Sequence, residues 1–254
     1  MPNLLWADYQ PWDFGNEADG TRVVFGSPHR AHLQLANADL LVSFDADLFG
    51  CHPAALSNAK GFGVARDPKR ANVLRTYAIE SVFTSLGSVA DHRLPARAEH
   101  IKVLLVGLEA LLSGGNLNQL SSELLTEERV SKFLVALAAD VKRFGAKSVV
   151  AVGARQPADV HAICARINSR IGASGNTVVY TAESSSSSQS IGSLASLAAK
   201  GSIENLLILG GNPAYDAPAD LDFKTALSKV QNSVHLSSYP VSYTHLTLPT
   251  TPYV

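Results

Sequence analysis

The stretch TEERVSKFLVALAADVKRFGAKSVVAVG, residues 126–153, contains the pattern that decides the fold. Its first part repeats apolar residues on one helical face, at Val130, Phe133, Leu134, Leu137 and Val141. Thr126 is a candidate N-cap for this helix, and Gly145 stands where a C-terminal cap belongs. The run Val149–Val152 is short and apolar and ends at Gly153, which predicts a buried strand.

The same alternation of strand and helix extends along the chain. Pro157 suits the first turn of a second helix, whose apolar stripe is Val160, Ile163, Cys164, Ile167 and Ile171. Further strands are expected at Arg22–Phe25, Leu40–Phe44, Asn72–Ile79, Thr177–Tyr180, Leu206–Leu209 and Val234–Leu236. Further helices are expected at residues 33–38, 96–112, 191–198 and 221–230, with a long polar loop at Ser81–Pro95. This order predicts an α/β fold with a doubly wound, mostly parallel sheet or sheets and helices on both faces, of the Rossmann-like type.

Four segments are expected along the chain. Residues 1–20 form an irregular N-terminal segment of a truncated domain, 21–125 a first α/β subdomain, and 126–239 a second. The serines 184–188 form a flexible loop within the second subdomain. Residues 240–254 change character abruptly and contain prolines that obstruct regular structure. They resemble a translated sequencing adapter, so we expect a non-native tail there.

Composition restricts the classes of function. The 254 residues are 46% hydrophobic and 17% charged, which favours a globular protein over a disordered one. The net charge of −1 gives no general attraction to nucleic acid or anionic lipid. The two cysteines, Cys51 and Cys164, are too few to hold an iron–sulfur cluster. No stretch reaches the length of a membrane span, and no signal sequence is recognisable at the start.

Two strand ends carry the residue types of a ligand site. Asp45 and Asp47 follow a predicted buried strand, which is where open α/β sheets bind ligands. They would hold a ribose, a metal or a proton, or else one would cap the following turn while the other is solvated. The segment Gly210-Gly211-Asn212-Pro213 permits close approach of a ligand, or is a tight turn without one. It lacks the G-x-G-x-x-G dinucleotide fingerprint.

Other polar residues favour structural roles. Thr84, Asp91, His92 and Arg93 lie on one loop and indicate a hydrogen-bonded loop or a partner surface rather than nucleophilic catalysis. Cys51 and His52 are adjacent and lack a nearby third ligand, so no metal site is expected there. Cys164 is expected in the core, and His161, one turn away, is expected to be exposed.

Three motifs, in order, resemble a known family. They are ADLLVSFDADL at residues 38–48, YAIES at 77–81 followed by ADHRLP at 90–95, and LILGGNPAYDAPAD at 207–220. They resemble the molybdopterin-oxidoreductase-like iron–sulfur subunits of alternative complex III, a bacterial respiratory complex. The resemblance runs from about Trp12 to Tyr239 and implies a fold of the molybdopterin-oxidoreductase type.

The resemblance implies a non-catalytic scaffold within a membrane-bound, quinol-oxidising electron-transfer complex. Iron–sulfur clusters would lie in another part of the same polypeptide, and the partners would be that cluster domain and other subunits of the complex. The location would be the periplasmic face of the inner membrane. Asp45, Asp47 and Gly210–Pro213 match cofactor-facing positions and are carried over as a vestigial site, with no catalytic residue, metal ligand or cofactor in this chain. Cys51 departs from the family, where a residue such as threonine is expected.

Two other hypotheses stay open at this stage. The chain would be the cofactor-binding portion of a working molybdenum-pterin oxidoreductase if a ligating residue and cationic phosphate contacts lay outside it. It would instead be a stand-alone nucleotide-binding α/β domain if a nucleotide bound near Asp45 and Gly210. The missing dinucleotide fingerprint weakens the second of these hypotheses.

Overall fold

The computed structural model describes residues 4–9, 15–183 and 189–237. The chain divides into a larger unit, Phe14–Ser184, and a smaller one that combines Met1–Asp13 with Ser185–Val254. This division differs from the boundary expected at 125/126, because strand β5 of the second half pairs with strand β2 of the first. The tail 240–254 and the serines 184–188 lie outside the described residues.

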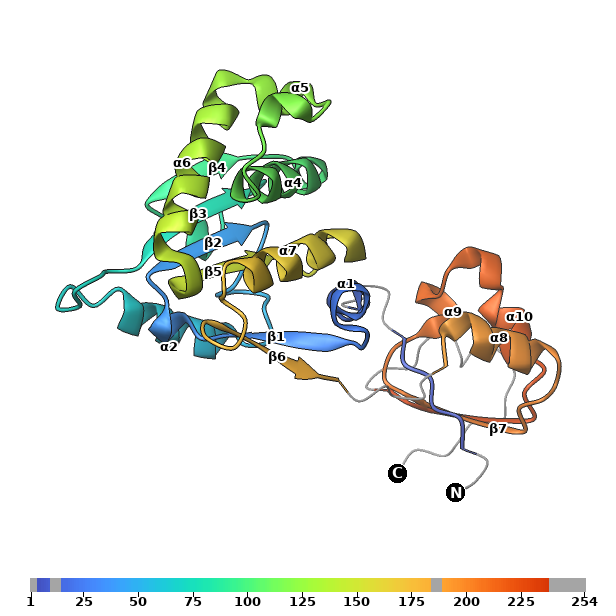
Figure 1. Ribbon diagram of the computed structural model, residues 1–254. Coiled ribbons are helices and arrows are strands. Elements are labelled where there is room, and N and C mark those ends of the chain that lie inside the picture. The colour runs from blue at the N-terminus through green and yellow to red at the C-terminus, as the bar shows by residue number, and fades with distance from the viewer. Residues whose placement is uncertain (1–3, 10–14, 184–188, 238–254) are drawn as a thin grey trace. The chain divides into compact units, whose positions relative to one another are not determined.

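The larger unit is built on a parallel sheet of four strands (Figure 1). They are β2 (Leu40–Phe44), β3 (Arg75–Glu80), β4 (His92–Pro95) and β5 (Ser148–Val152), arranged in the order β4-β3-β2-β5. The chain therefore builds the sheet outward from β2 in one direction and then returns to add β5 on its other side. All five residues of β2 are buried, as expected for a central strand covered on both faces.

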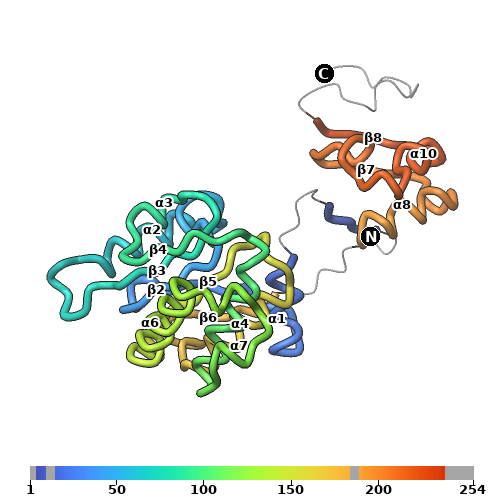
Figure 2. The backbone as a smooth tube through the Cα atoms, turned by 90° about the horizontal axis from the view of Figure 1, so that it is seen from above, coloured from blue at the N-terminus to red at the C-terminus, as the bar shows by residue number. Residues whose placement is uncertain are grey.

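Helices cover both faces of this sheet (Figure 2). On one side lie α2 (Ala55–Ala65) and α3 (Ser85–Ser88), and on the other α4 (Ile101–Leu112), α6 (Glu128–Phe144) and α7 (Ala158–Arg170). The connection from β2 through α2 to β3 uses the first face, whereas α4 and α6 link β4 to β5 over the second. The predicted doubly wound, Rossmann-like α/β fold is thus confirmed.

The two faces have separate apolar cores because side chains alternate along β2. Leu40, Val42 and Phe44 pack with α4, α6 and α7, and Leu41 packs on the side of α2. The predicted face of α6 is buried at Val130, Leu134, Leu137 and Val141. The predicted C-cap is confirmed at Gly145, whose φ is 50°.

The predicted N-cap of α6 is wrong. The cap is Glu127, while the Thr126 hydroxyl donates to the carbonyl of Glu123 at the end of α5 (Glu123–Thr126).

Two predictions in the larger unit are wrong, and a third element is a strand as predicted but with an unexpected partner. Arg22–Phe25 is the end of helix α1 (Asn16–Phe25), which packs against α7. The strand expected near Thr177 is β6 (Val178–Ala182), which pairs antiparallel with β1 (His29–Leu33) outside the parallel sheet. The expected loop Ser81–Pro95 contains both α3 and β4.

Short 3-10 helices complete the larger unit. They are η1 (Leu35–Asn37), η2 (Ala98–His100), η3 (Leu117–Gln119) and η4 (Gly145–Lys147). The first falls within the helix expected at residues 33–38, and the second leads into α4 within the helix expected at 96–112.

The smaller unit contains a parallel pair of strands, β7 (Asn205–Leu209) and β8 (Asn232–Leu236). Its helices are α8 (Ile191–Ala199), α9 (Pro213–Asp216), η5 (Ala219–Leu221) and α10 (Phe223–Leu227). Helices α8 and α10 pack their apolar side chains onto one face of the strand pair, around Ala195, Ile208 and Phe223. The strands agree with the prediction, and α10 is shorter than the helix expected at 221–230.

Candidate functional site

The strand order of the larger unit creates a topological switch point between β2 and β5. Connections leave these neighbouring strands toward opposite faces of the sheet, and ligands of open α/β proteins bind in the crevice that results. Asp45 follows β2 and Gly153 follows β5 at this point. Asp45, which the sequence analysis singled out, therefore lies at this switch point.

The switch point is closed by backbone contact. The N–H of Gly153 donates to the carbonyl of Phe44 at 2.9 Å. A Cβ added at Gly153 would lie 2.0 Å from the carbonyl oxygen of Asp45, so only glycine fits. The two chain segments therefore touch where a crevice would begin.

Gln156 completes this closure. Its side-chain amide donates to Oδ2 of Asp45 at 3.0 Å and lies 3.3 Å from the carbonyl of Ala98. The residue is only 4% exposed, so the amide is held within the protein. Asp45 itself has a φ of 55°, and its N–H donates to the carbonyl of Ile79 at 2.7 Å. The carboxylate of Asp45 is thus hydrogen-bonded to Gln156. Its left-handed backbone conformation is held by the hydrogen bond to Ile79.

Asp47 has the capping role that the sequence left open for one of the two aspartates. Its Oδ1 accepts the N–H of Gly50, and its Oδ2 the N–H of Cys51, each at 3.1 Å. These bonds fix the turn after β2 and occupy both carboxylate oxygens.

Glu80, at the end of β3, is the third acid at this edge of the sheet and was not singled out from the sequence. It is 3% exposed. Its Oε1 accepts from Nε of Arg93 and its Oε2 from the hydroxyl of Thr84, both at 2.6 Å. A charged residue that ends an apolar strand was the signal available, but its partner Arg93 lies on the next strand, β4. The buried carboxylate of Glu80 therefore has a hydrogen-bond donor at each oxygen.

The polar loop residues have structural contacts, as expected. Asp91 accepts from the guanidinium of Arg66 at 2.8 Å and from the backbone N–H of Thr76 at 2.8 Å. The ring of His92 stacks on Tyr77 with centroids 4.4 Å apart. Thr84, besides donating to Glu80, caps α3 by accepting the N–H of Gly87. Together these contacts hold β4 and α3 against β3.

The glycine segment belongs to the smaller unit, whereas both aspartates belong to the larger one. Gly210 and Gly211 have φ values of 69° and 65°, which favour glycine. The N–H of Gly210 donates to the carbonyl of Leu236, and His235 lies 3.0 Å from the carbonyl of Gly211.

Helix α9, which begins at Pro213 after this turn, is too short to offer an anion-binding helix N-terminus. It spans only Pro213–Asp216. Its first residue has no N–H to offer an anion. Asn212 is the N-cap of this helix. The segment is therefore a tight turn from β7 into a single helical turn.

The cysteines are separate and free, with Cys51 exposed and Cys164 buried. The Cys164 thiol donates to the carbonyl of Val150 at 3.2 Å, and burial raises its pKa to about 12. Cys164 is thus a core residue, as predicted. The prediction for His161 is wrong: the residue is only 7% exposed, because α1 covers this part of α7.

Comparison with models of known protein families gave no match, and comparison with curated protein sequences gave no significant match. Over the described residues, no group of three or more His, Cys, Asp or Glu side chains is arranged to hold a metal ion. Within the same ranges, no helix combines the length and apolar character needed to cross a membrane.

Proposed function

We propose that the chain is a non-catalytic scaffold within a molybdopterin-oxidoreductase-like subunit of a membrane-bound, quinol-oxidising respiratory complex. The observation that supports this proposal is the engagement of the acids at the carboxyl edge of the sheet. Asp45 is bonded to Gln156, Asp47 to two backbone N–H groups, and Glu80 to Arg93 and Thr84.

The chemistry of this edge also disfavours a pterin dinucleotide. Such a cofactor carries phosphates, which require N–H donors or cationic side chains. The edge instead presents the carboxylates of Asp45, Asp47 and Glu80, and the guanidinium of Arg93 is already paired with Glu80. A phosphate placed here would face like charge and would have to break existing hydrogen bonds.

The identity of the complex rests on the resemblance of the three motifs. The first motif forms β2 and the turn capped by Asp47, and the second supplies the Glu80–Arg93 pair. The third forms β7 and the glycine turn of the smaller unit. In this proposal the iron–sulfur clusters lie elsewhere in the same polypeptide, on the periplasmic face of the inner membrane, and electrons pass through them from quinol.

Sequencing the genomic reading frame around this chain, and purifying its natural product, tests the proposal. We expect C-x-x-C-x-x-C runs in the same frame and iron–sulfur signals in electron paramagnetic resonance spectra of the purified subunit. A complete reading frame without cysteine runs would reject the proposal.

A stand-alone nucleotide-binding domain is a second candidate, which the strand order favours. Counted in chain order, the strands lie 3-2-1-4, as do the first four strands of dinucleotide-binding folds. Saturable thermal stabilisation of the chain by NAD would favour this candidate. We expect no stabilisation, because Gln156 and Gly153 already fill the position where the nucleotide would enter.

A further inference from the structure

A small, partly open cavity lies in the larger unit, beside the end of β5 and the segment after β2. Its free volume is about 40 Å³, and its wall is formed by α1, β1, β5, β6, α7 and the segment after β2. The polar side chains that line it include Glu17, His52, His161, Asn168 and Tyr180. Buried polar groups are nearly always hydrogen-bonded, so we expect each of these side chains to have a hydrogen-bond partner.

His161 is the central observation. The residue is 7% exposed, and its Nε2 has no hydrogen-bond partner within the described part of the chain. Burial lowers the pKa of the imidazole to about 4, so the ring is neutral at pH 7. An unpaired nitrogen in this position would cost roughly 1–3 kcal/mol.

Helix α1 packs closely against the turn of α7 that carries His161. A Cβ at Gly20 of α1 would meet the carbonyl oxygen of Ala158 at 2.3 Å and the Cβ of His161 at 2.6 Å. Helices α1 and α7 are therefore in close contact beside the ring. The backbone of Gly153, Ala154 and Gln156 also hydrogen-bonds to the imidazole and partly offsets the effect of burial on its pKa. Nε2 itself has no partner among the described residues, and His161 lines the cavity.

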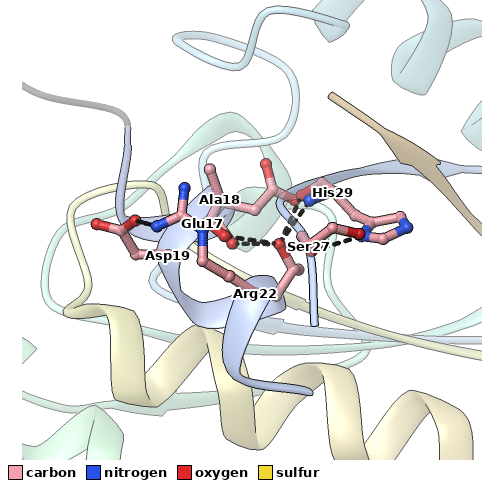
Figure 3. A network of polar contacts seen from close by, with 7 residues as sticks. Glu17, Ala18, Asp19, Arg22, Ser27 and His29 are labelled. Atoms are coloured by element: carbon pink, nitrogen blue, oxygen red, sulfur yellow. Dashed lines mark hydrogen bonds and ion pairs between the residues drawn. The ribbon is translucent and has the colours of Figure 1, made fainter. Parts of the chain in front are cut away.

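Glu17 contributes a carboxylate to the same cavity. One carboxylate oxygen accepts the N–H of Ala31 at 3.0 Å, and burial is the largest influence raising the pKa of the acid. Its position is fixed by the network in Figure 3, which joins α1 to the start of β1. There the Thr21 hydroxyl accepts the N–H of His29 at 2.9 Å and lies 2.8 Å from the carbonyl oxygens of Glu17 and His29.

Tyr180 supplies a donor to the same cavity. Its hydroxyl accepts from the amide of Asn168 at 3.3 Å, which leaves its own O–H to donate. The cavity thus presents a donor at Tyr180, an acceptor at Glu17 and an imidazole nitrogen at His161. A ligand that both donates and accepts hydrogen bonds satisfies all three, whereas an apolar occupant satisfies none.

We propose that this cavity is a hydration site, which holds a cluster of internal water molecules bridging Nε2 of His161 to Glu17 and Tyr180. At roughly 10–15 Å³ of free volume for each water, the cavity has room for about three. The cluster bonds α1 to α7 and β6, three elements that are remote in the sequence. Water is therefore part of the packing between the α1–β1 segment and the rest of the larger unit.

Water-proton magnetic relaxation dispersion on the full chain counts the long-lived waters. We expect about three fewer in a His161→Leu variant and about one fewer in Tyr180→Phe, which keeps the shape of the ring. His32→Leu, at an exposed position on β1, is the matched control and should leave the number unchanged. Equal numbers in wild type and Tyr180→Phe would overturn the proposal.

Xenon pressurisation of wild-type crystals is a second test, and it does not depend on the folding of any variant. Dry apolar cavities take up xenon, whereas a cavity filled by hydrogen-bonded water does not. We expect water density within hydrogen-bond distance of Nε2 of His161 and no xenon there. Xenon in this cavity, or an empty cavity at high resolution, would contradict the hydration site.

Discussion

Replacing Arg93 with methionine tests how the carboxyl edge of the sheet is held together. The side chains of Arg93 and Glu80 are 20% and 4% exposed and are joined at 2.6 Å. Methionine removes the charge while keeping most of the apolar length, so Glu80 is left buried with Thr84 as its remaining side-chain partner. Breaking a buried pair in this way costs about 3–5 kcal/mol. The Arg93 guanidinium also lies 3.9 Å from the centre of the Phe83 ring, a contact that the variant loses.

Urea unfolding followed by circular dichroism, together with amide hydrogen exchange of β3, measures this loss. The control is Arg22→Met, which breaks an ion pair with Asp19 whose side chains are 55% and 59% exposed. Exposed pairs contribute about 0–1 kcal/mol, so this variant should remain close to wild type. The double variant Arg93→Met, Glu80→Gln should regain much of the loss, because no unpaired charge remains. A cost for Arg93→Met no greater than for Arg22→Met would refute the reasoning.

Three further predictions concern the switch point and the cavity. Asp47→Ala removes the cap of the turn after β2 and should lower the free energy of unfolding by about 1 kcal/mol in urea titrations, whereas Asp47→Asn should lose less. Gly153→Ala forces a Cβ against the carbonyl of Asp45 and should abolish or severely reduce soluble folded protein, as judged by circular dichroism, although Gly63→Ala, in open space, should not. Because the pKa of His161 is lowered from 6.5 to about 4, the unfolded chain binds this proton first, and stability should fall by up to ~3 kcal/mol as the pH drops through that range. The pH dependence of unfolding should be flatter in His161→Leu, and an unchanged profile would contradict this prediction.

Elements with a long, regular apolar pattern were predictable from the sequence. The period of α6 and the apolar run of β5 identified both elements before any tertiary contact was considered. The glycines at 145 and 153 marked their ends because of the conformations and close contacts that these positions require. The resulting alternation was sufficient to predict a doubly wound fold.

Elements defined by distant partners were not predictable. The residues Arg22–Phe25 have an apolar pair that suits a strand, but packing of α1 against α7 makes them helical. Strand β6 is a strand as predicted, yet periodicity does not reveal that its partner is β1. His161 was expected at the surface because it lies off the apolar face that the helical period defines. The sequence does not reveal that α1 covers this part of α7.

The candidate site likewise combines features that were predictable from the sequence with features that were not. The position of Asp45 followed from a strand end, and capping was one of the roles considered for Asp47 and its neighbour. The closure of the switch point depends on Gln156, which lies 111 residues from Asp45 in the chain. Such a bond connects two loops whose proximity exists only in the folded sheet.

The molybdenum content of the natural full-length subunit, measured by mass spectrometry of metals on the purified complex, tests the central claim most directly. Because the acids at the switch point are bonded within the protein, we expect far less than one molybdenum or tungsten atom per subunit, and no pterin fluorescence after oxidative release. One metal atom and one pterin recovered per subunit would contradict the account.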